Sequence, residues 1–257
     1  MDLGEFREPL TIETAAWYLT IFEDPLSFEE LAMLSEDVSA KLRVLAVTAL
    51  LVEANSNRFC HHLIRSALIR INFLEHCLAE SKLQNFRRAS SRNEPLFDAM
   101  AAGDFERAQK IASLSPKEWL SNAEYEDDYA YTQVIHRLII QDSNSSSEIQ
   151  MLMDQFERTL EGNPTPRFTL CHALRQRDQE AFDEAFEDLL TERDNKIAAE
   201  EERGRMEEPE SLADQRVFVE GLGVLRLADR LGFVTQPEYR YCPAVARLPM
   251  TQPFPRE

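Results

Sequence analysis

The stretch EDVSAKLRVLAVTALLVEA, residues 36–54, decides the fold class. Its side chains Val38, Leu42, Leu45 and Ala49 recur at three- and four-residue spacing, which predicts an α-helix. Ala46 and Val52 belong to the same stripe, and further apolar residues extend it almost around the helix: Val44, Val47, Leu50 and Leu51. We therefore expect this helix at the centre of a helical bundle rather than at its edge.

A second long helix follows the break at Asn55-Ser56-Asn57 and is expected to run to about Phe86. Its buried side is marked by Phe59, Leu63, Ala67, Ile71, Leu74 and Leu78. Two long helices joined by a short break form an antiparallel hairpin, the usual beginning of a helical bundle.

Most of the remaining chain also has helical patterns. The expected helices cover residues 11–22, 95–102, 104–113, 124–140, 147–162, 166–176, 179–202 and 212–231. Ser27 with Glu30 is a capping box, and Ser115-Pro116-Lys117-Glu118 has the same signature of a helix start. A proline-rich tail follows Gly232.

An internal similarity links residues 99–106 and 173–180, each of which reads as a helix end, a tight turn and an Asp-capped helix, with caps at Asp104 and Asp178. Paired helices of this kind also build tetratricopeptide-like solenoids, although two ordinary hairpins explain the pattern equally well. We expect an all-α, multi-helix bundle of antiparallel hairpins, partly tetratricopeptide-like or superhelical.

The polar segment 87–93 is the best candidate for a boundary within the chain. It separates an N-terminal hairpin region, 1–90, from a C-terminal helical region, 91–249, with a tail at 250–257. We expect the two regions to form one continuous globular unit.

Charge excludes several classes of function. The 257 residues carry 28 basic and 46 acidic side chains, a formal charge of −18, and contain only 7 glycines. Scarce glycine argues against a glycine-rich phosphate loop, and a surface this acidic repels nucleic acid. Residues 58–92 carry a basic surplus, but they lack interleaved exposed aromatics and could instead face the acidic regions internally or across a dimer interface.

The sequence favours a cytoplasmic protein without a membrane span. The first residues lack the basic start and apolar core of a signal peptide. The longest nearly apolar run, 44–52, is about half of what a membrane span requires. Four scattered cysteines, Cys60, Cys77, Cys171 and Cys242, fit reduced and mostly buried thiols.

No catalytic motif is present. The five histidines are not followed by aspartate, and His-Glu-x-x-His, Cys-x-x-Cys and Gly-x-Ser-x-Gly are absent. Cys60-His61-His62 and His76-Cys77 resemble a zinc set, but on one helix His62 and His76 would lie roughly 21 Å apart. We therefore predict no enzyme activity, no metal and no cofactor.

Acidic clusters are the informative feature. Between Asp178 and Asp214 there are fifteen acids and four bases, and the expected helix buries one face while the other carries Asp183, Glu184, Glu187 and Asp188. A second cluster comprises Glu124, Tyr125, Glu126, Asp127, Asp128, Tyr129 and Tyr131. These residues are candidate partner-binding sites, since carboxylates attract a cationic partner and tyrosines supply contact area. The alternatives are a solvated helix face and carboxylates stabilised at a helix N-terminus.

The second cluster also carries a family resemblance. Four sets of residues carry it: Asp104-Phe-Glu-Arg-Ala, the stretch 124–131 with Ile135-His-Arg-Leu, Phe168-x-Leu-Cys-His-Ala-Leu with Asp178 to Leu190, and Gly221-Leu-Gly-Val-Leu-Arg-Leu-Ala-Asp. They are similar to the immunity protein 49 family of bacterial polymorphic toxin systems. The resemblance covers about residues 90–245. It implies a mostly helical protein that binds and neutralises a cognate antibacterial toxin, often a nuclease and often delivered by a contact-dependent or type VI secretion route.

Two alternatives stay open beside this hypothesis. One is a tetratricopeptide-like scaffold or chaperone that binds peptide segments of an effector, and the other is an all-α hydrolase, which would need a metal. A basic toxin is the expected partner. A homodimer also stays open, because the first hairpin is so apolar that part of it could pack against a second copy of the chain.

Overall fold

The structure is a computed structural model that describes residues 3–140, 145–203 and 208–255. Regular secondary structure in these ranges is helical, with an isolated bridge between Tyr239 and Cys242. This confirms the expected all-α class. The helices in chain order are α1 (Leu3–Glu23), α2 (Phe28–Leu51), α3 (Ser56–Ala79), η1 (Phe86–Arg88), α4 (Glu94–Ala101), α5 (Phe105–Leu114), α6 (Glu126–Ile140), α7 (Ser145–Thr159), α8 (Pro166–Gln176), α9 (Gln179–Glu202), α10 (Pro209–Arg216), α11 (Val219–Leu231) and η2 (Ala244–Arg247).

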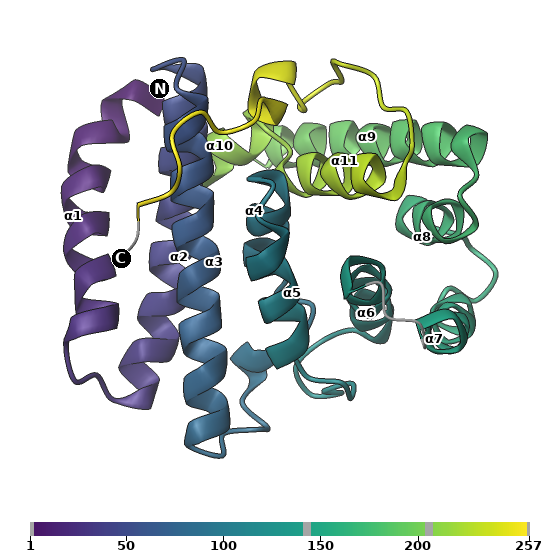
Figure 1. Cartoon of the computed structure of the whole chain (residues 1–257), viewed down its shortest axis with the longest axis horizontal. Coiled ribbons are helices and arrows are strands. Elements are labelled where there is room, and N and C mark those ends of the chain that lie inside the picture. The colour runs from purple at the N-terminus through teal and green to yellow at the C-terminus, as the bar shows by residue number, and fades with distance from the viewer. Residues whose placement is uncertain (1–2, 141–144, 204–207, 256–257) are drawn as a thin grey trace.

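Two groups of helices cross each other: one is α1, α2 and α3, and the other contains α9 and α11. Figure 1 shows α1, α2 and α3 side by side, with α9 and α11 lying across their direction and α4 and α5 between the two groups. A single hydrophobic cluster extends from Leu3 to Ala246 and joins both groups. The boundary expected near residue 90 stays a prediction.

The central hairpin follows from its caps and its apolar stripe. The Ser27 backbone N–H donates to Glu30 Oε2 at 2.9 Å, and Glu30 N donates to Ser27 Oγ at 3.3 Å, so the predicted capping box begins α2. Asn55 Oδ1 accepts from Arg58 N at 2.9 Å and begins α3. Because α2 buries nearly every residue from Leu42 to Leu50, it is the central helix that the sequence predicted.

Both turns of the internal similarity have the expected form. Gly103 (φ +77°) ends the first helix and Asp104 Oδ1 accepts from Arg107 N at 3.1 Å. In the second turn Arg177 adopts the left-handed conformation (φ +60°), and Asp178 caps α9 through Ala181 N at 3.1 Å.

Two helix predictions are wrong, and in both cases contacts distant in sequence override the local signal. The Ser115 hydroxyl donates back to Ile111 O at 2.9 Å, and the Pro116 carbonyl accepts from Gln133 at 2.9 Å, so no helix starts there. The expected helix 212–231 is interrupted at Val217 and Phe218, where Phe218 N donates to Tyr241 O at 2.8 Å.

Two expected helix boundaries are shifted. The second helix of the hairpin ends at Ala79 instead of about Phe86, because Ser81 turns the chain with φ +57° and Lys82 N donates to Cys77 O. Helix α1 begins at Leu3 instead of Thr11 and contains Pro9. Helical spacing of apolar residues predicted the helix 11–22, and this row faces outward: Ile12, Ala15, Ala16, Leu19 and Phe22 are all exposed, Ile12 at 68% and Leu19 at 53%.

Close packing joins α11 to α4. A Cβ added at Gly223 would lie 3.1 Å from the backbone oxygen of Phe97 and 3.2 Å from Met100 Cβ. Only hydrogen fits at this crossing without displacement of α4. This contact positions α11 against the core.

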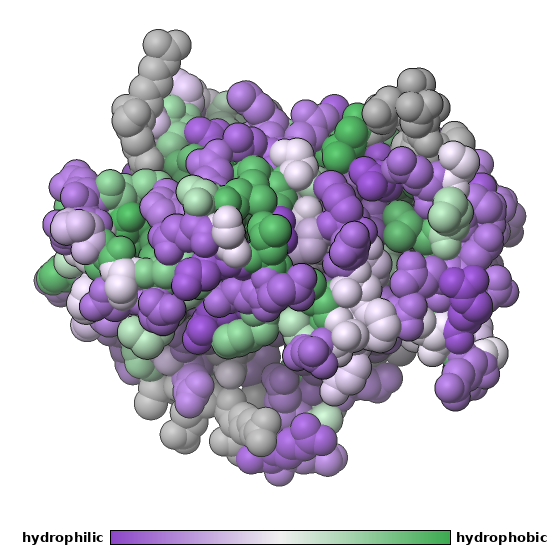
Figure 2. Space-filling view, turned by 90° about the horizontal axis from the view of Figure 1, so that it is seen from below, coloured by the Kyte–Doolittle hydropathy of each residue, from purple (hydrophilic) through white to green (hydrophobic). Residues whose placement is uncertain are grey.

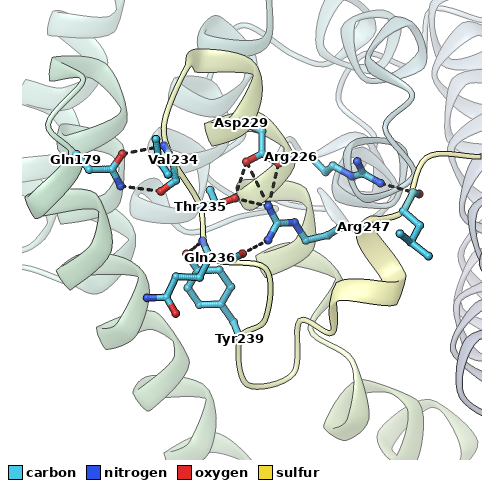
Figure 3. A network of polar contacts seen from close by, with 9 residues as sticks. Gln179, Arg226, Asp229, Val234, Thr235, Gln236, Tyr239 and Arg247 are labelled. Atoms are coloured by element: carbon cyan, nitrogen blue, oxygen red, sulfur yellow. Dashed lines mark hydrogen bonds and ion pairs between the residues drawn. The ribbon is translucent and has the colours of Figure 1, made fainter.

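The chain after α11 is fastened to the helices beneath it, as Figure 3 shows. The Gln179 side chain and the Val234 backbone exchange hydrogen bonds of 3.1 and 2.9 Å. The Arg247 guanidinium contacts Asp229 at 3.0 Å and the Gln236 carbonyl at 2.6 Å. This network holds the segment on α9 and α11.

The end of the described chain then returns to α3. Asn57 Oδ1 accepts from Thr251 N at 2.8 Å and Gln252 N at 3.0 Å, and the Phe254 ring lies edge-on to His61 and below Arg65.

No described helix is long and apolar enough to cross a bilayer. The face in Figure 2 carries separate hydrophobic patches among predominantly hydrophilic side chains.

Candidate functional site

A cleft of about 530 Å³ lies between the two groups of helices. It is bounded by side chains of α2, α4, α6, α8, α9, α10 and α11. We call it the central cleft. Charged side chains dominate its lining, so its chemistry is that of ion pairs and hydrogen bonds.

One ion pair in the central cleft joins α2 to α4. Arg43 donates through Nε to both oxygens of Asp98 at 2.9 and 3.1 Å and through Nη2 at 3.1 Å. Ser66 Oγ donates to the same carboxylate at 2.6 Å. Because Asp98 is fully buried, these donors are needed to satisfy its oxygens.

A second pair joins α8 to α11. Arg167 donates to both oxygens of Glu220 at 2.9 and 2.8 Å, and the Tyr131 hydroxyl donates to Glu220 Oε1 at 2.9 Å. Burial raises the pKa of Glu220, but the Arg167 charge and these hydrogen bonds outweigh burial, so that its pKa lies below the usual range. Glu220 is therefore ionised at neutral pH and holds Arg167 and Tyr131 in place.

A third contact closes the cleft at α10. Arg193 is only 6% exposed, and its guanidinium carbon lies 4.3 Å from the centre of the Phe218 ring. Its Nη2 contacts both the backbone oxygen of Asp214 and, at 3.1 Å, the Asp214 carboxylate. These contacts tie α9 to α10.

The charge of the central cleft is unbalanced. Its lining contains eight carboxylates and four basic side chains. Asp128 is half-buried and has no hydrogen-bond donor or ion-pair partner among the residues that the structure describes. Burial, with the neighbouring Asp127 charge, raises the pKa of Asp128. A cation placed in the cleft would relieve this uncompensated charge.

The structure divides the predicted cluster of residues 124–131. Only Asp128 and Tyr131 line the cleft. Glu124 accepts from Ser91 N at 2.7 Å and Glu126 from Gln155 at 2.7 Å, so both have structural partners. The Tyr129 hydroxyl donates to Lys117 O at 2.6 Å.

Exposure also separates the tyrosines of that cluster. Tyr129 and Tyr131 are buried, at 4% and 2% exposure, whereas Tyr125 is 78% exposed. Buried rings cannot supply contact area to a partner that meets the folded surface. Tyr125 alone among these three can act as the aromatic contact that the sequence predicted.

The predicted cluster of Asp183, Glu184, Glu187 and Asp188 lies on the outer side of α9. Asp183 accepts from Gln179 at 3.0 Å, and Glu187 pairs with Arg240 at 3.3 Å. Glu184 and Asp188 are exposed and have no partner among the described residues. Four-residue spacing continues this row to Glu192, which lines the central cleft and lies 3.9 Å from Arg167.

Sequence reasoning missed the paired residues that shape the cleft. Arg43, Asp98, Arg167, Arg193 and Glu220 belong to no motif. Arg43 did carry a signal, because it is the one charge in the stretch 42–52 of a helix predicted to be buried. Buried charges in such helices need a partner.

No candidate metal centre is found within the described residues: no three of their His, Cys, Asp and Glu side chains converge on one point. All four cysteines are buried and free. Burial raises the pKa of Cys60 and Cys77 to about 11 and that of Cys242 to about 12. These thiols are therefore protonated at neutral pH and serve as apolar core groups.

Fold and cleft together describe an α-helical protein with a charged, mostly acidic groove. The family model of immunity protein 49 matches residues 31–246, and the chain belongs to that family. The match begins about sixty residues earlier than the resemblance seen in the sequence and includes the central hairpin. Its general role is that of an immunity protein, which binds a cognate toxin. Neither the curated proteins nor the solved structures contain a match to the chain.

Proposed function

We propose that this immunity protein neutralises a basic toxin with nuclease activity by placing carboxylates at and beside the central cleft against the toxin's basic surface. These are Asp127, Asp128, Glu184 and Asp188, and we call them the acidic rim of the cleft. The observation that carries the proposal is the unbalanced charge of the cleft, with Asp128 unpaired at its edge. Nucleases need cationic surfaces to bind phosphate backbones, and such surfaces complement carboxylates.

The row on α9 supports the same proposal. Glu180, Glu184, Asp188 and Glu192 follow one another at four-residue spacing and are all exposed. Like charges at this spacing destabilise a helix by about 0.2–0.5 kcal/mol per pair. A cationic partner bound to the row neutralises this repulsion, and the energy that the repulsion costs the free helix then favours binding. The negative field of the row also raises the rate at which such a partner meets the cleft.

We narrow the proposed contact residues to side chains that the fold leaves available. Asp127, Asp128, Glu184, Asp188 and Tyr125 can meet a partner directly. The other predicted residues of the two clusters already have partners within the chain, and we assign them to the support of the surface.

Charge reversal tests the proposal against the product of the adjacent toxin gene. The double variant Glu184→Lys/Asp188→Lys should bind the toxin more weakly, with a smaller dependence of affinity on salt. The matched control is Glu23→Lys/Glu29→Lys, which changes net charge equally at two exposed residues outside the family match. Equal loss in both variants would show that only total charge matters, and no loss in either would refute the acidic interface.

The cellular setting belongs to the proposal as well. We propose that the chain acts in the cytoplasm, protects the producing cell and its sisters from a toxin delivered by contact-dependent or type VI secretion, and inhibits by binding without catalysis. Family membership supports this setting. The homodimer stays a prediction, which sedimentation of the purified chain tests directly.

A peptide-binding scaffold is the second candidate. It is favoured by the open groove between helix groups. The two functions differ in what must bind: a scaffold captures an unfolded peptide of the toxin, whereas the proposed inhibitor requires the folded toxin domain. Titration with both forms distinguishes them.

A further inference from the structure

A second, smaller cavity lies beside the central cleft. Its volume is about 210 Å³, and side chains of α2, α3 and the beginning of α4 line it. Arg43 and Glu94 line both spaces and form the wall between them. Because pockets for drug-sized ligands measure roughly 300–1,000 Å³, this cavity suits a single small group.

Three polar atoms in the lining residues of this cavity are buried and have no hydrogen-bond partner among the described residues. They are Ser35 Oγ, Arg70 Nε and Arg92 Nε. Ser35 is 6% and Arg70 7% exposed. Buried polar groups in folded proteins are nearly always paired, so three orphans around one cavity require an explanation.

The chemistry of these atoms defines the group that would satisfy them. An arginine Nε–H can only donate a hydrogen bond, and a serine hydroxyl can also donate. The complementary group is therefore an acceptor that can face at least two donors. A carboxylate or a phosphate has this geometry, and arginine is the side chain best suited to both.

Charge points to the same class of group. Arg70 donates to the carbonyls of Arg87 at 2.7 Å and Ala89 at 2.9 Å, and it contacts no carboxylate among the described residues. Burial lowers the pKa of Arg70 to about 10. The nearby Glu94 and Glu36 charges act against burial but do not outweigh it, so this buried guanidinium, whose hydrogen bonds go to carbonyls, is only partly compensated.

The carboxylates that line the cavity do not remove this charge. Glu36 is held between Arg87 at 2.9 Å and Arg92 at 2.5 Å, so one carboxylate meets two cations. Glu94 is exposed at the start of α4. Arg43 is already paired with Asp98.

We propose that this cavity is an oxyanion-binding site, in which Ser35, Arg70 and Arg92 bind a single carboxylate or phosphate group. The site is separate from the acidic rim of the central cleft and opposite to it in charge. It requires no toxin, so it can be tested on the purified full chain alone.

Calorimetric titration with sodium phosphate and with sodium acetate tests the site, with sodium chloride at equal ionic strength as the blank. At least one of the two anions should bind. Ser35→Ala should weaken binding by about tenfold or more, since it removes one hydrogen bond to a charged group. The same variant should leave the anion-free protein as stable as before, because Ser35 Oγ bonds to nothing within the described chain.

Two further variants separate a local effect from one of net charge. Arg92→Gln should weaken anion binding, whereas Arg158→Gln, which removes an exposed charge on α7, should leave it unchanged. Binding of phosphate alone, acetate alone or both supports the site and identifies the chemistry it accepts. Absence of binding by both anions, or binding that Ser35→Ala and Arg92→Gln leave unaltered, would overturn it, and neither result would affect the proposed acidic interface.

Discussion

Replacement of Glu220 by glutamine tests whether the ion pair with Arg167 stabilises the fold. The side chain of Glu220 is 18% exposed and that of Arg167 34%. Loss of one partner costs about 3–5 kcal/mol in a fully buried pair and less than about 1 kcal/mol in an exposed pair. For this half-buried pair, in which the amide can still accept from Tyr131, we expect Glu220→Gln to lower the free energy of unfolding by about 2 kcal/mol.

The pH dependence of this effect has a defined sign. Because the folded-state pKa of Glu220 lies below its ordinary value of 4.5, its stabilisation is complete above that value. It is lost as the pH falls through the folded-state pKa. The difference in unfolding free energy between wild type and Glu220→Gln should therefore be constant near neutral pH and shrink below about pH 4.5.

Urea unfolding followed by circular dichroism measures both quantities. Glu192→Gln is the matched control, because Glu192 also faces Arg167 but at 3.9 Å and with a side chain 50% exposed. It should cost less than about 0.5 kcal/mol. If the two variants lose equal stability, or if the Glu220→Gln difference persists unchanged in acid, the pair does not stabilise the fold in the way the geometry indicates.

Three further outcomes are expected. Gly223→Ala should destabilise the fold by about 1–3 kcal/mol in urea unfolding, because its Cβ would meet the Phe97 backbone oxygen at 3.1 Å; a neutral result would show that α4 can move. Asn57→Ala should speed proteolysis after Thr251 without changing the melting temperature by more than a few degrees, since Asn57 accepts from Thr251 N and Gln252 N; unchanged cleavage would show that the contacts of His61 with the Gln252 carbonyl and with Phe254 are enough to hold the segment. The native protein should resist a thiol reagent at pH 8 that labels four cysteines after unfolding, and rapid native labelling would contradict their burial.

The fold was predictable where local and long-range forces agree. The apolar stripe of residues 36–54 predicted a central helix because a helix covered with apolar side chains has to be buried. Caps at Ser27, Asp104 and Asp178 also form as expected, since the donor and the acceptor of each capping hydrogen bond are three residues apart in the sequence. Such interactions can be identified from spacing alone.

Predictions failed where a distant partner competed for the same group. Ser115 has the composition of a cap, but its hydroxyl donates back to Ile111, and the next carbonyl is taken by Gln133. Similarly, Tyr241 O accepts the Phe218 N–H and interrupts a stretch with continuous helical periodicity. The outward face of α1 is another limit: helical spacing identified the helix but not which side of it is buried.

The candidate site was only partly predictable, for a related reason. Acidic density identified α9 and the start of α6, which border the central cleft. It could not identify the ion pairs, because Arg43 and Asp98 are 55 residues apart and Arg167 and Glu220 are 53 apart. Glu124 and Tyr129 were predicted to be surface contacts for a partner, because the residues next to them in the sequence do not show that their hydrogen-bond partners lie in other loops.

The distinction between paired and unpaired charge decides what a partner can recognise. A cation that enters the central cleft gains little from Asp98 or Glu220, because their oxygens already accept from arginine and a hydroxyl group, and breaking those bonds leaves a buried charge unpaired. Asp128, Glu184 and Asp188 have no such competitor in the described chain. The paired charges therefore fix the shape of the cleft, and under the proposed function the unpaired ones are those that a basic surface would meet, which is why the charge-reversal variants and their control differ in position and not in total charge.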